Sequence, residues 1–328
     1  MNINSPIAVT MGDPSGIGPE ITVKVLSNTE LPIKVYGNLE ILKHTAKKLK
    51  LELDHKKIFN TINLTRQELR EIKHSKPTML TGKIAYSAIE FAVKDCLTKD
   101  AKALVTGPIS KLALHLAGHK WPGHTELLSY LSNPKNPSRV RMALLNKNFL
   151  IVLNSIHLSL KDAIITLNTK RLLETFHITS LWAKENKIHD PHLWVAALNP
   201  HSGESGLLGK EEKDILEPAI NIAKHHNINI SGPWPADTLF MKIKKINTAF
   251  PPKNIIISLY HDQALIPFKL DGLDNGINIT AGLPFLRASV DHGTAFDIAG
   301  KGVASETPLK NAIILTQNLL SRTKFDEK

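Results

Sequence analysis

The feature that most constrains the fold is an alternation of short apolar runs with longer amphipathic stretches. Strand-sized apolar runs lie at residues 6–10, 33–37, 103–106, 193–198 and 255–259. The clearest helical pattern covers residues 81–97, where apolar side chains recur at i, i+3 and i+4. Strands that alternate with helices in this way build a largely parallel sheet. We therefore predict an α/β protein.

Further elements fit the same scheme. Residues 139–145 and 149–153 are apolar and flank Asn146-Lys147-Asn148, which predicts a hairpin. Other helices are predicted to begin near Pro19 and Glu211 and to cover residues 172–184 and 309–320.

The length of 328 residues predicts about two domains at roughly 150 residues each. No stretch rich in Pro, Gly and Ser divides the chain into halves, which argues against two domains strung on a linker. No apolar run approaches the length of a membrane span, and the N-terminus lacks the features of a signal peptide. We expect a cytoplasmic protein with no membrane partner.

The formal net charge of +11 invites a nucleic-acid interpretation, which the composition does not favour. Only seven of the 41 basic residues are Arg, whereas base readers and phosphate clamps rely on the bidentate guanidinium. A solvated Lys-rich surface explains the charge, and we expect no nucleic-acid partner. The single cysteine, Cys96, excludes a disulfide framework and a cysteine-based metal site.

Histidines follow three of the apolar strands at equivalent positions: His157, His201 and His261. Ligands of parallel sheets bind at the carboxyl ends of the strands, so these three side chains are predicted to share one edge. Three imidazoles with open positions make a catalytic metal site that suits zinc or cobalt better than magnesium. A histidine in such a loop is also commonly a hydrogen-bonded structural residue, and geometry alone leaves both interpretations open.

Other loops carry polar residues without a decisive pattern. Residues 11–20 are glycine-rich but lack the G-x-G-x-x-G fingerprint of dinucleotide-binding folds. Thr125 in the stretch 123–126 can serve simply as a helix cap. Lys269 and Arg287 offer positive charge for a phosphate or a carboxylate.

Taken together, these segments resemble the 4-hydroxythreonine-4-phosphate dehydrogenase family of pyridoxal phosphate biosynthesis. The resemblance is carried, in order along the chain, by MGDPSGIGPE (11–20), TGPISK (106–111), GHTE (123–126), IHLSL (156–160), LNPHSGESGLLGKEE (198–212), GPWPADTLF (232–240), YHDQ (260–263) and GINITAGLPFLRASVDHGTAFDIAGKG (276–302).

A wider relation is also visible, because HGTAFDIAGKG and GDPSGIGPE are similar to loops of isopropylmalate and isocitrate dehydrogenases. The resemblance implies a two-domain α/β/α fold of that kind, with the active site in the interdomain cleft and at a homodimer interface. The first domain is expected to comprise residues 1–117 and 282–328, and the second residues 118–281.

The resemblance also implies roles for individual residues. His157, His201 and His261 match the metal ligands, one of which comes from the partner subunit in the family. The positions that match substrate-binding residues are His124, Thr125, Lys269, Asn278 and Arg287. The positions that match the nicotinamide cofactor loop are Asp291, His292, Gly293, Thr294 and Ala295. Two features depart from the pattern: Ala264 stands where Gly is common in the family, and the N-terminal domain looks short around residues 55–80.

The implied reaction is metal-dependent oxidation of the C3 hydroxyl of 4-phosphooxy-L-threonine by NAD or NADP. Decarboxylation to 3-amino-2-oxopropyl phosphate follows, as a step of pyridoxine biosynthesis. The metal is expected to be zinc, with cobalt and magnesium as alternatives. Asp237 and Asp262 are candidate proton acceptors.

Three other functions stay open at this point. A paralogue of the family would oxidise another phosphorylated hydroxy-acid or a dihydrodiol with the same metal and cofactor residues. A phosphate acyltransferase of related architecture would need neither the three histidines nor the HGTAFDIAGKG loop. A nucleic-acid-binding protein would show steeply salt-dependent binding.

Overall fold

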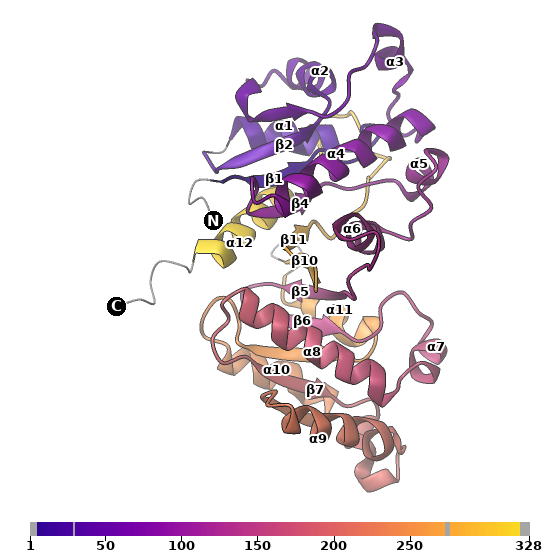
Figure 1. The fold of residues 1–328 in the computed structure, drawn as a ribbon, viewed down its shortest axis with the longest axis vertical. Coiled ribbons are helices and arrows are strands. Elements are labelled where there is room, and N and C mark those ends of the chain that lie inside the picture. The colour runs from indigo at the N-terminus through magenta and orange to yellow at the C-terminus, as the bar shows by residue number, and fades with distance from the viewer. Residues whose placement is uncertain (1–4, 29, 273–275, 322–328) are drawn as a thin grey trace. The chain divides into compact units, whose positions relative to one another are not determined.

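The computed structural model describes residues 5–28, 30–272 and 276–321 (Figure 1). The described residues form two compact units, unit 1 within residues 5–138 and 283–320 and unit 2 within residues 139–282. The sequence placed the first boundary after residue 117. The structure instead assigns residues 118–138 to unit 1, because helix α6 (His124–Ser132) packs against helix α4 (Met79–Leu97) of that unit.

Unit 1 is built on parallel strands in the order β3-β2-β1-β4-β11. Their bounds are β1 (Ile7–Thr10), β2 (Ile33–Gly37), β3 (Ile58–Asn60), β4 (Ala103–Thr106) and β11 (Leu286–Ser289). Every residue of β1, β4 and β11 is buried, which is the pattern of a parallel sheet covered on both faces.

The helices of unit 1 begin where the sequence supplies caps. The hydroxyl of Thr78 accepts from the amide of Thr81 at the start of α4, and α4 then packs across β1, β2 and β4. The carbonyl oxygen of the Asn38 side chain caps α2 in the same way. The helices in the unit are α1 (Gly18–Ser27), α2 (Leu39–Leu49), α3 (Arg66–Glu71), α4, α5 (Lys111–Leu116), α6 and α12 (Thr307–Ser321), with a 3₁₀ turn at His55–Lys57.

Unit 2 has a mixed set of strands in the order β10-β5-β6-β9-β7-β8. Strands β5 and β6 form the predicted antiparallel hairpin, and β10 adds to β5 antiparallel. Strands β6, β9, β7 and β8 are parallel neighbours. Their bounds are β5 (Arg141–Leu145), β6 (Leu150–Leu153), β7 (His192–Ala196), β8 (Ile230–Trp234), β9 (Asn254–Ser258) and β10 (Ile277–Ala281).

Helices cover both faces of these strands. Helix α8 packs on β5, β6 and β10, and Figure 1 shows it in front of the strands of unit 2. On the other face, Ile151, Trp194 and Ile256 pack with apolar side chains of α10 and α11 in one core. The helical segments of this unit are α7 (Leu160–Ile165), α8 (Thr169–Glu185), α9 (Glu217–His225), α10 (Ala236–Ile246), α11 (His261–Leu270) and a π-helical turn at Glu212–Leu216. Residues Pro200–Gly206 form a turn with left-handed backbone angles.

These observations confirm the predicted α/β class, because each strand-sized run of the sequence is a strand of the structure. None of the described helices combines the length and the apolar character that a membrane crossing needs.

Candidate active site

The three histidines lie at one edge of unit 2. His157 follows β6, His201 follows β7 and His261 follows β9. These strands are parallel neighbours in the order β6-β9-β7, so their carboxyl ends meet at the same edge. The sequence prediction of a shared edge is therefore confirmed.

His157 and His261 are neighbours within one chain. Their ring centroids are 5.8 Å apart. A cavity of about 240 Å³ opens beside them, lined by His157, Leu158, Leu160, Tyr260, His261 and Asp262. His261 is the first residue of α11, and its Nδ1 lies 2.6 Å from Oδ1 of Asp262. A carboxylate on Nδ1 holds a histidine in the tautomer whose Nε2 carries the lone pair for a metal.

His201 lies in an unusual turn. Residues 201–205 all have φ between +43° and +78°, although only Gly203 is a glycine. A left-handed conformation costs about 1–2 kcal/mol for each non-glycine residue, so the turn must be held by its surroundings.

Glu212, which is buried, supplies much of that restraint. Its Oε1 accepts from the amides of Leu198 and Asn199 at 2.8 and 2.7 Å, and its Oε2 accepts from the Asn199 side chain. The carboxylate thereby fixes the segment that enters the turn. Glu212 had no role in the sequence prediction, although it lies in one of the segments that carry the resemblance.

Another residue without a sequence-derived role ties the strand ends together. Gln263 is buried; its Oε1 accepts from the amide of Leu259, and its Nε2 donates to the carbonyl of Ala197 at 2.8 Å. Because these two carbonyl and amide groups follow β7 and β9, Gln263 sets the spacing of the turns that carry His201 and His261.

The described residues of a single chain contain no group of three or more His, Cys, Asp or Glu side chains placed to hold one metal ion. The paired imidazoles of His157 and His261, with a carboxylate on one of them, are nevertheless the donor set that zinc and cobalt prefer. The three-histidine metal site stays a prediction, and within one chain the described residues bring two of its histidines, His157 and His261, together.

The other residues assigned to unit 2 lie on separate elements. Lys269 is exposed in the last turn of α11, and Asn278 is half-buried in β10. Asp237 is exposed in the first turn of α10.

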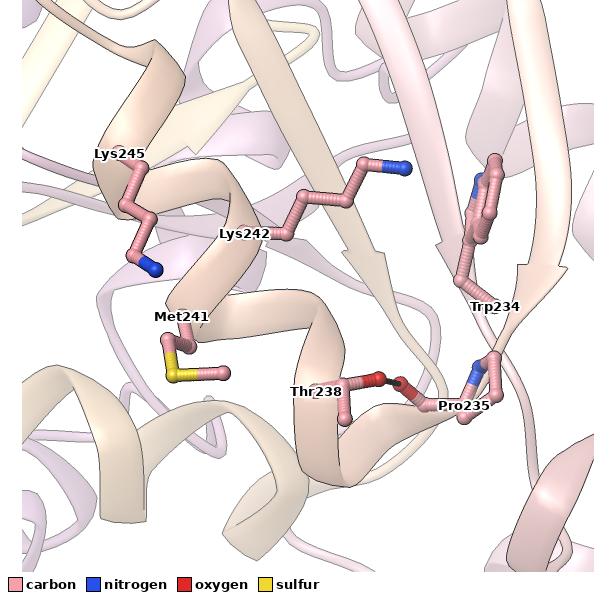
Figure 2. A pocket seen from close by; sticks show the side chains of 6 residues that line it. All are labelled: Trp234, Pro235, Thr238, Met241, Lys242 and Lys245. Atoms are coloured by element: carbon pink, nitrogen blue, oxygen red, sulfur yellow. Dashed lines mark hydrogen bonds between the residues drawn. The ribbon is translucent and has the colours of Figure 1, made fainter.

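Helix α10 also borders a second cavity, of about 460 Å³ (Figure 2). Figure 2 shows Lys242 reaching toward the ring of Trp234, and its Nζ lies 4.0 Å from the ring centroid. The remaining lining residues are Pro235, Thr238, Met241 and Lys245. None of the residues predicted to bind substrate, cofactor or metal lines this cavity.

In unit 1, Arg287 lies in β11 and is only 3% exposed. Its Nη2 donates to Oγ1 of Thr106, at the end of β4, at 2.7 Å. Burial lowers the pKa of its guanidinium to about 9. A cation held this deep in the fold is a strong attractor for an anionic ligand.

His124, at the start of α6, lies near Arg287. Burial, together with the charge of Arg287, holds the pKa of His124 well below its usual value. Its Nε2 is buried and has no hydrogen-bond partner among the described residues. The structure thus brings together a buried guanidinium and a neutral imidazole from positions 163 residues apart (287 − 124).

The loop at residues 291–295 also belongs to unit 1. The carbonyl of Thr294 accepts from the amide of Ile17 at 3.0 Å, which fastens the loop to the glycine-rich segment before α1. A side chain at Gly293 would meet open space, and Nε2 of His292 is buried with no described hydrogen-bond partner. An open backbone beside an unsatisfied polar atom fits a polar cofactor.

Comparison with known proteins gives a consistent result. The sequence profile of the family described as "Pyridoxal phosphate biosynthetic protein PdxA" matches residues 24–316. A D-threonate 4-phosphate dehydrogenase of Salmonella typhimurium is 37% identical over 95% of this chain and 98% of its own length. A 4-hydroxythreonine-4-phosphate dehydrogenase of Beijerinckia indica is 37% identical over 98% of this chain and 97% of its own. The crystal structure of the 4-hydroxythreonine-4-phosphate dehydrogenase of Klebsiella pneumoniae superposes with a TM-score of 0.86, at 34% identity, over 96% of this chain and 99% of the other.

Proposed function

The chain belongs to the PdxA family of pyridoxal phosphate biosynthetic proteins, and we propose that it oxidises 4-phosphooxy-L-threonine with NAD or NADP. The single observation that carries the proposal is the match to 4-hydroxythreonine-4-phosphate dehydrogenases along nearly the full length of both chains. The same matches favour a dehydrogenase over an acyltransferase.

The phosphate of the substrate is the ligand that suits the buried pair in unit 1. Arg287 supplies a guanidinium that can donate two parallel hydrogen bonds to phosphate oxygens. His124 stays neutral near pH 7 because its pKa is depressed, and its buried Nε2 is available to the ligand. Lys269 and Asn278 complete the proposed set of substrate-binding residues, together with Thr125.

His157, His201 and His261 would hold the divalent metal, with zinc ahead of cobalt and magnesium. When bound, such an ion acts as a Lewis acid that lowers the pKa of the C3 hydroxyl. Asp262 holds the His261 ring through its Nδ1, which gives this carboxylate an orienting role. Asp237, exposed at the start of α10, is then the better candidate to accept the hydroxyl proton.

Residues 291–295 would bind the nicotinamide cofactor, which accepts the hydride from C3. The products of this step are the ketone, the reduced cofactor and a proton. The ketone lies β to the substrate carboxylate, so it loses carbon dioxide and leaves 3-amino-2-oxopropyl phosphate. The chain's part in both steps is to hold the reacting atoms in contact.

A homodimer that shares the active site fits the surface around the histidines. Large apolar side chains beside His157 and His201 are exposed, among them Leu158 (42%), Leu160 (56%), Ile165 (68%) and Leu207 (84%). Exposed apolar side chains that gather around a functional edge are typical of a covered interface. We propose that a second copy of this chain covers them and completes the metal site.

The shared site is tested by mixing two inactive variants. His201→Ala and His261→Ala are each expected to abolish metal-dependent NADH formation with an unchanged circular-dichroism spectrum. If His201 and His261 reach one site from different subunits, refolding or exchanging the two variants together restores about a quarter of the wild-type activity, since half of the dimers carry one intact site. Absence of any restoration, in dimers shown to have exchanged, would contradict the shared site.

The substrate is tested with a panel. Relatives named for D-threonate 4-phosphate and for 4-hydroxythreonine-4-phosphate match this chain at the same 37% identity, so both compounds belong in it. The proposal predicts a higher kcat/KM for 4-phosphooxy-L-threonine and release of one carbon dioxide for each NADH formed. Full activity of wild-type protein in metal-free buffer would contradict the proposed metal dependence.

A further inference from the structure

Side chains of other elements make several of the hydrogen bonds that hold the segment between β11 and α12. Residues 290–306 contain no helix and no strand, so their amide and carbonyl groups have no regular ladder to join. This segment starts with the proposed cofactor loop at residues 291–295. Because buried backbone groups must find partners, the groups that bind the segment decide its shape.

An ion pair on α1 binds the far end of the segment. Glu20 and Lys24 are one helical turn apart, with 3.0 Å between Oε1 and Nζ, and their side chains are only 4% and 17% exposed. The Glu20 carboxylate accepts from the amide of Gly302 at 3.1 Å and from the amide of Ala304 at 2.7 Å. The Lys24 ammonium donates to the carbonyls of the same two residues at 3.0 and 2.5 Å.

The arrangement matches the polarity of the backbone. At both Gly302 and Ala304, the amide meets the carboxylate and the carbonyl meets the ammonium. The pair therefore supplies the donors and acceptors that a neighbouring strand would otherwise provide. A buried ion pair of this kind is satisfied only while both partners and the backbone groups are in place.

Other contacts fix the segment at points closer to the cofactor loop. The amide of Ile17 binds the carbonyl of Thr294, the Ser75 hydroxyl donates to the carbonyl of Phe296, and Nζ of Lys48 donates to the carbonyl of Gly300 at 2.6 Å. Ile17 immediately precedes α1, the helix that carries the ion pair. One rigid helix and its N-terminal turn thus bind both ends of the segment.

We propose that Glu20 and Lys24 form a backbone clamp that positions the cofactor loop, so that cofactor affinity depends on two residues that need not touch the cofactor. The identity of the ligand in this inference rests on the proposed function. Both are positioning residues, since they act through the conformation of residues 296–304.

The inference predicts a specific kinetic pattern. Glu20→Gln and Lys24→Met each remove charged hydrogen bonds to the segment, so the Kd and KM for the nicotinamide cofactor rise by roughly tenfold or more. The KM for the phosphorylated substrate changes less than about twofold, since Arg287 and His124 lie on other elements. A general loss of stability would instead affect both constants together.

Two further variants distinguish the proposed clamp from the loss of an ordinary ion pair. Lys43→Met breaks an exposed ion pair with Glu40 on α2 of the same unit, where the side chains are 43% and 55% exposed, and is expected to leave the cofactor constants unchanged. Glu20→Lys combined with Lys24→Glu keeps an ion pair but opposes the polarity of Gly302 and Ala304. The clamp predicts that this double variant fails to recover cofactor affinity, whereas a simple ion-pair role predicts recovery.

Hydrogen–deuterium exchange tests the clamp without any measurement of enzyme activity. In wild-type protein, peptides covering residues 300–304 are expected to be protected although they lie in no helix or strand. In both single variants the exchange of residues 296–304 speeds up by tenfold or more, whereas exchange in α4 is unchanged. If one of the two single variants does not fold, the clamp is still tested by the protection of residues 300–304 in the wild type and by the exchange of the other single variant.

The outcomes separate this inference from the proposed function. Wild-type protein that forms no NADH with the substrate panel overturns the proposed function, and the exchange data still test the clamp. Unprotected amides at residues 300–304, or variants with wild-type cofactor Kd and wild-type exchange, overturn the clamp whatever the substrate is.

Discussion

Replacement of Arg287 by Met should separate function from stability. Arg287 is almost fully buried in β11, and the structure describes a hydrogen bond from its guanidinium to Thr106. Met has a similar length and no charge. If Arg287 is there to bind the substrate phosphate, the variant should lose substrate affinity without losing stability.

Both magnitudes can be worked out. Charge-assisted hydrogen bonds contribute about 1.5–3 kcal/mol each, so losing the contact to phosphate should raise the substrate KM by about 10- to 100-fold. Burial shifts the pKa from 12.5 to about 9, a destabilisation of the charged form of the order of 5 kcal/mol that applies in full below pH 9. The bond to Thr106 offsets part of it, and a methionine at this position would carry no such cost of burying a charge.

The assay is steady-state NADH formation together with thermal unfolding. The Tm of Arg287→Met should equal or exceed that of the wild type, by roughly 2–4 °C for each kcal/mol gained. Arg139→Met is a matched control, since Arg139 is 71% exposed in an ion pair with Glu174, and should change neither quantity appreciably. A substrate KM within twofold of wild type, or a Tm lower by more than about 5 °C, would refute this account of Arg287.

Three further predictions follow from the site. The pKa of His124 is depressed in the folded state, so as the pH falls below about 6.5 the unfolded chain binds a proton at this histidine before the folded chain does, and the free energy of unfolding decreases. Urea unfolding of the wild type and of His124→Asn at about pH 7.5 and 5.5 should show that the free energy of unfolding decreases less in the variant. Asp262→Ala removes the acceptor on His261 and should weaken zinc binding by about 10- to 100-fold in a chelator competition; an unchanged affinity would argue against the orienting role. Gly16→Ala places a Cβ 2.7 Å from the carbonyl oxygen of Thr294, so it should cost about 1–3 kcal/mol of stability and raise the cofactor Kd. A variant that unfolds like the wild type would show that the loop at residues 291–295 moves to accommodate the methyl group at no cost.

The parts of the fold that the sequence predicted are those with uninterrupted apolar runs. Strands β1, β4 and β9 are buried throughout, so their sequences are continuously apolar or nearly so. Strand β8 was missed because it contains Gly232 and Pro233, residues that usually mark loops. It is the last strand in the order of unit 2, where proline is tolerated because one side of the strand has no ladder to complete.

Strands β10 and β11 were missed for a different reason. Asn278 and Thr280 alternate with apolar residues in β10, and Arg287 and Ser289 do so in β11. In β11 every residue is buried, including the arginine. From the sequence, an arginine next to a predicted loop is expected to lie on the surface. The hydrogen bond of Arg287 to Thr106, 181 residues away, forms only in the folded chain.

The candidate site also has parts that the sequence could predict and parts that it could not. The shared edge of His157, His201 and His261 could be predicted, because each follows an apolar strand and parallel strands end together. The left-handed turn around His201 and its restraint by Glu212 could not, since they depend on contacts rather than on residue type. The proposed clamp of Glu20 and Lys24 could not be predicted from the sequence either, because a Glu and a Lys four residues apart on a helix normally form an ion pair on the surface.

The most direct test of the central claim is NADH formation by the metal-loaded, full-length protein with 4-phosphooxy-L-threonine, measured beside D-threonate 4-phosphate and with carbon dioxide followed in parallel. The account predicts that 4-phosphooxy-L-threonine has the higher kcat/KM, that one carbon dioxide appears for each NADH, and that a chelator stops both. No turnover of this substrate, or a clear preference for D-threonate 4-phosphate, would contradict it.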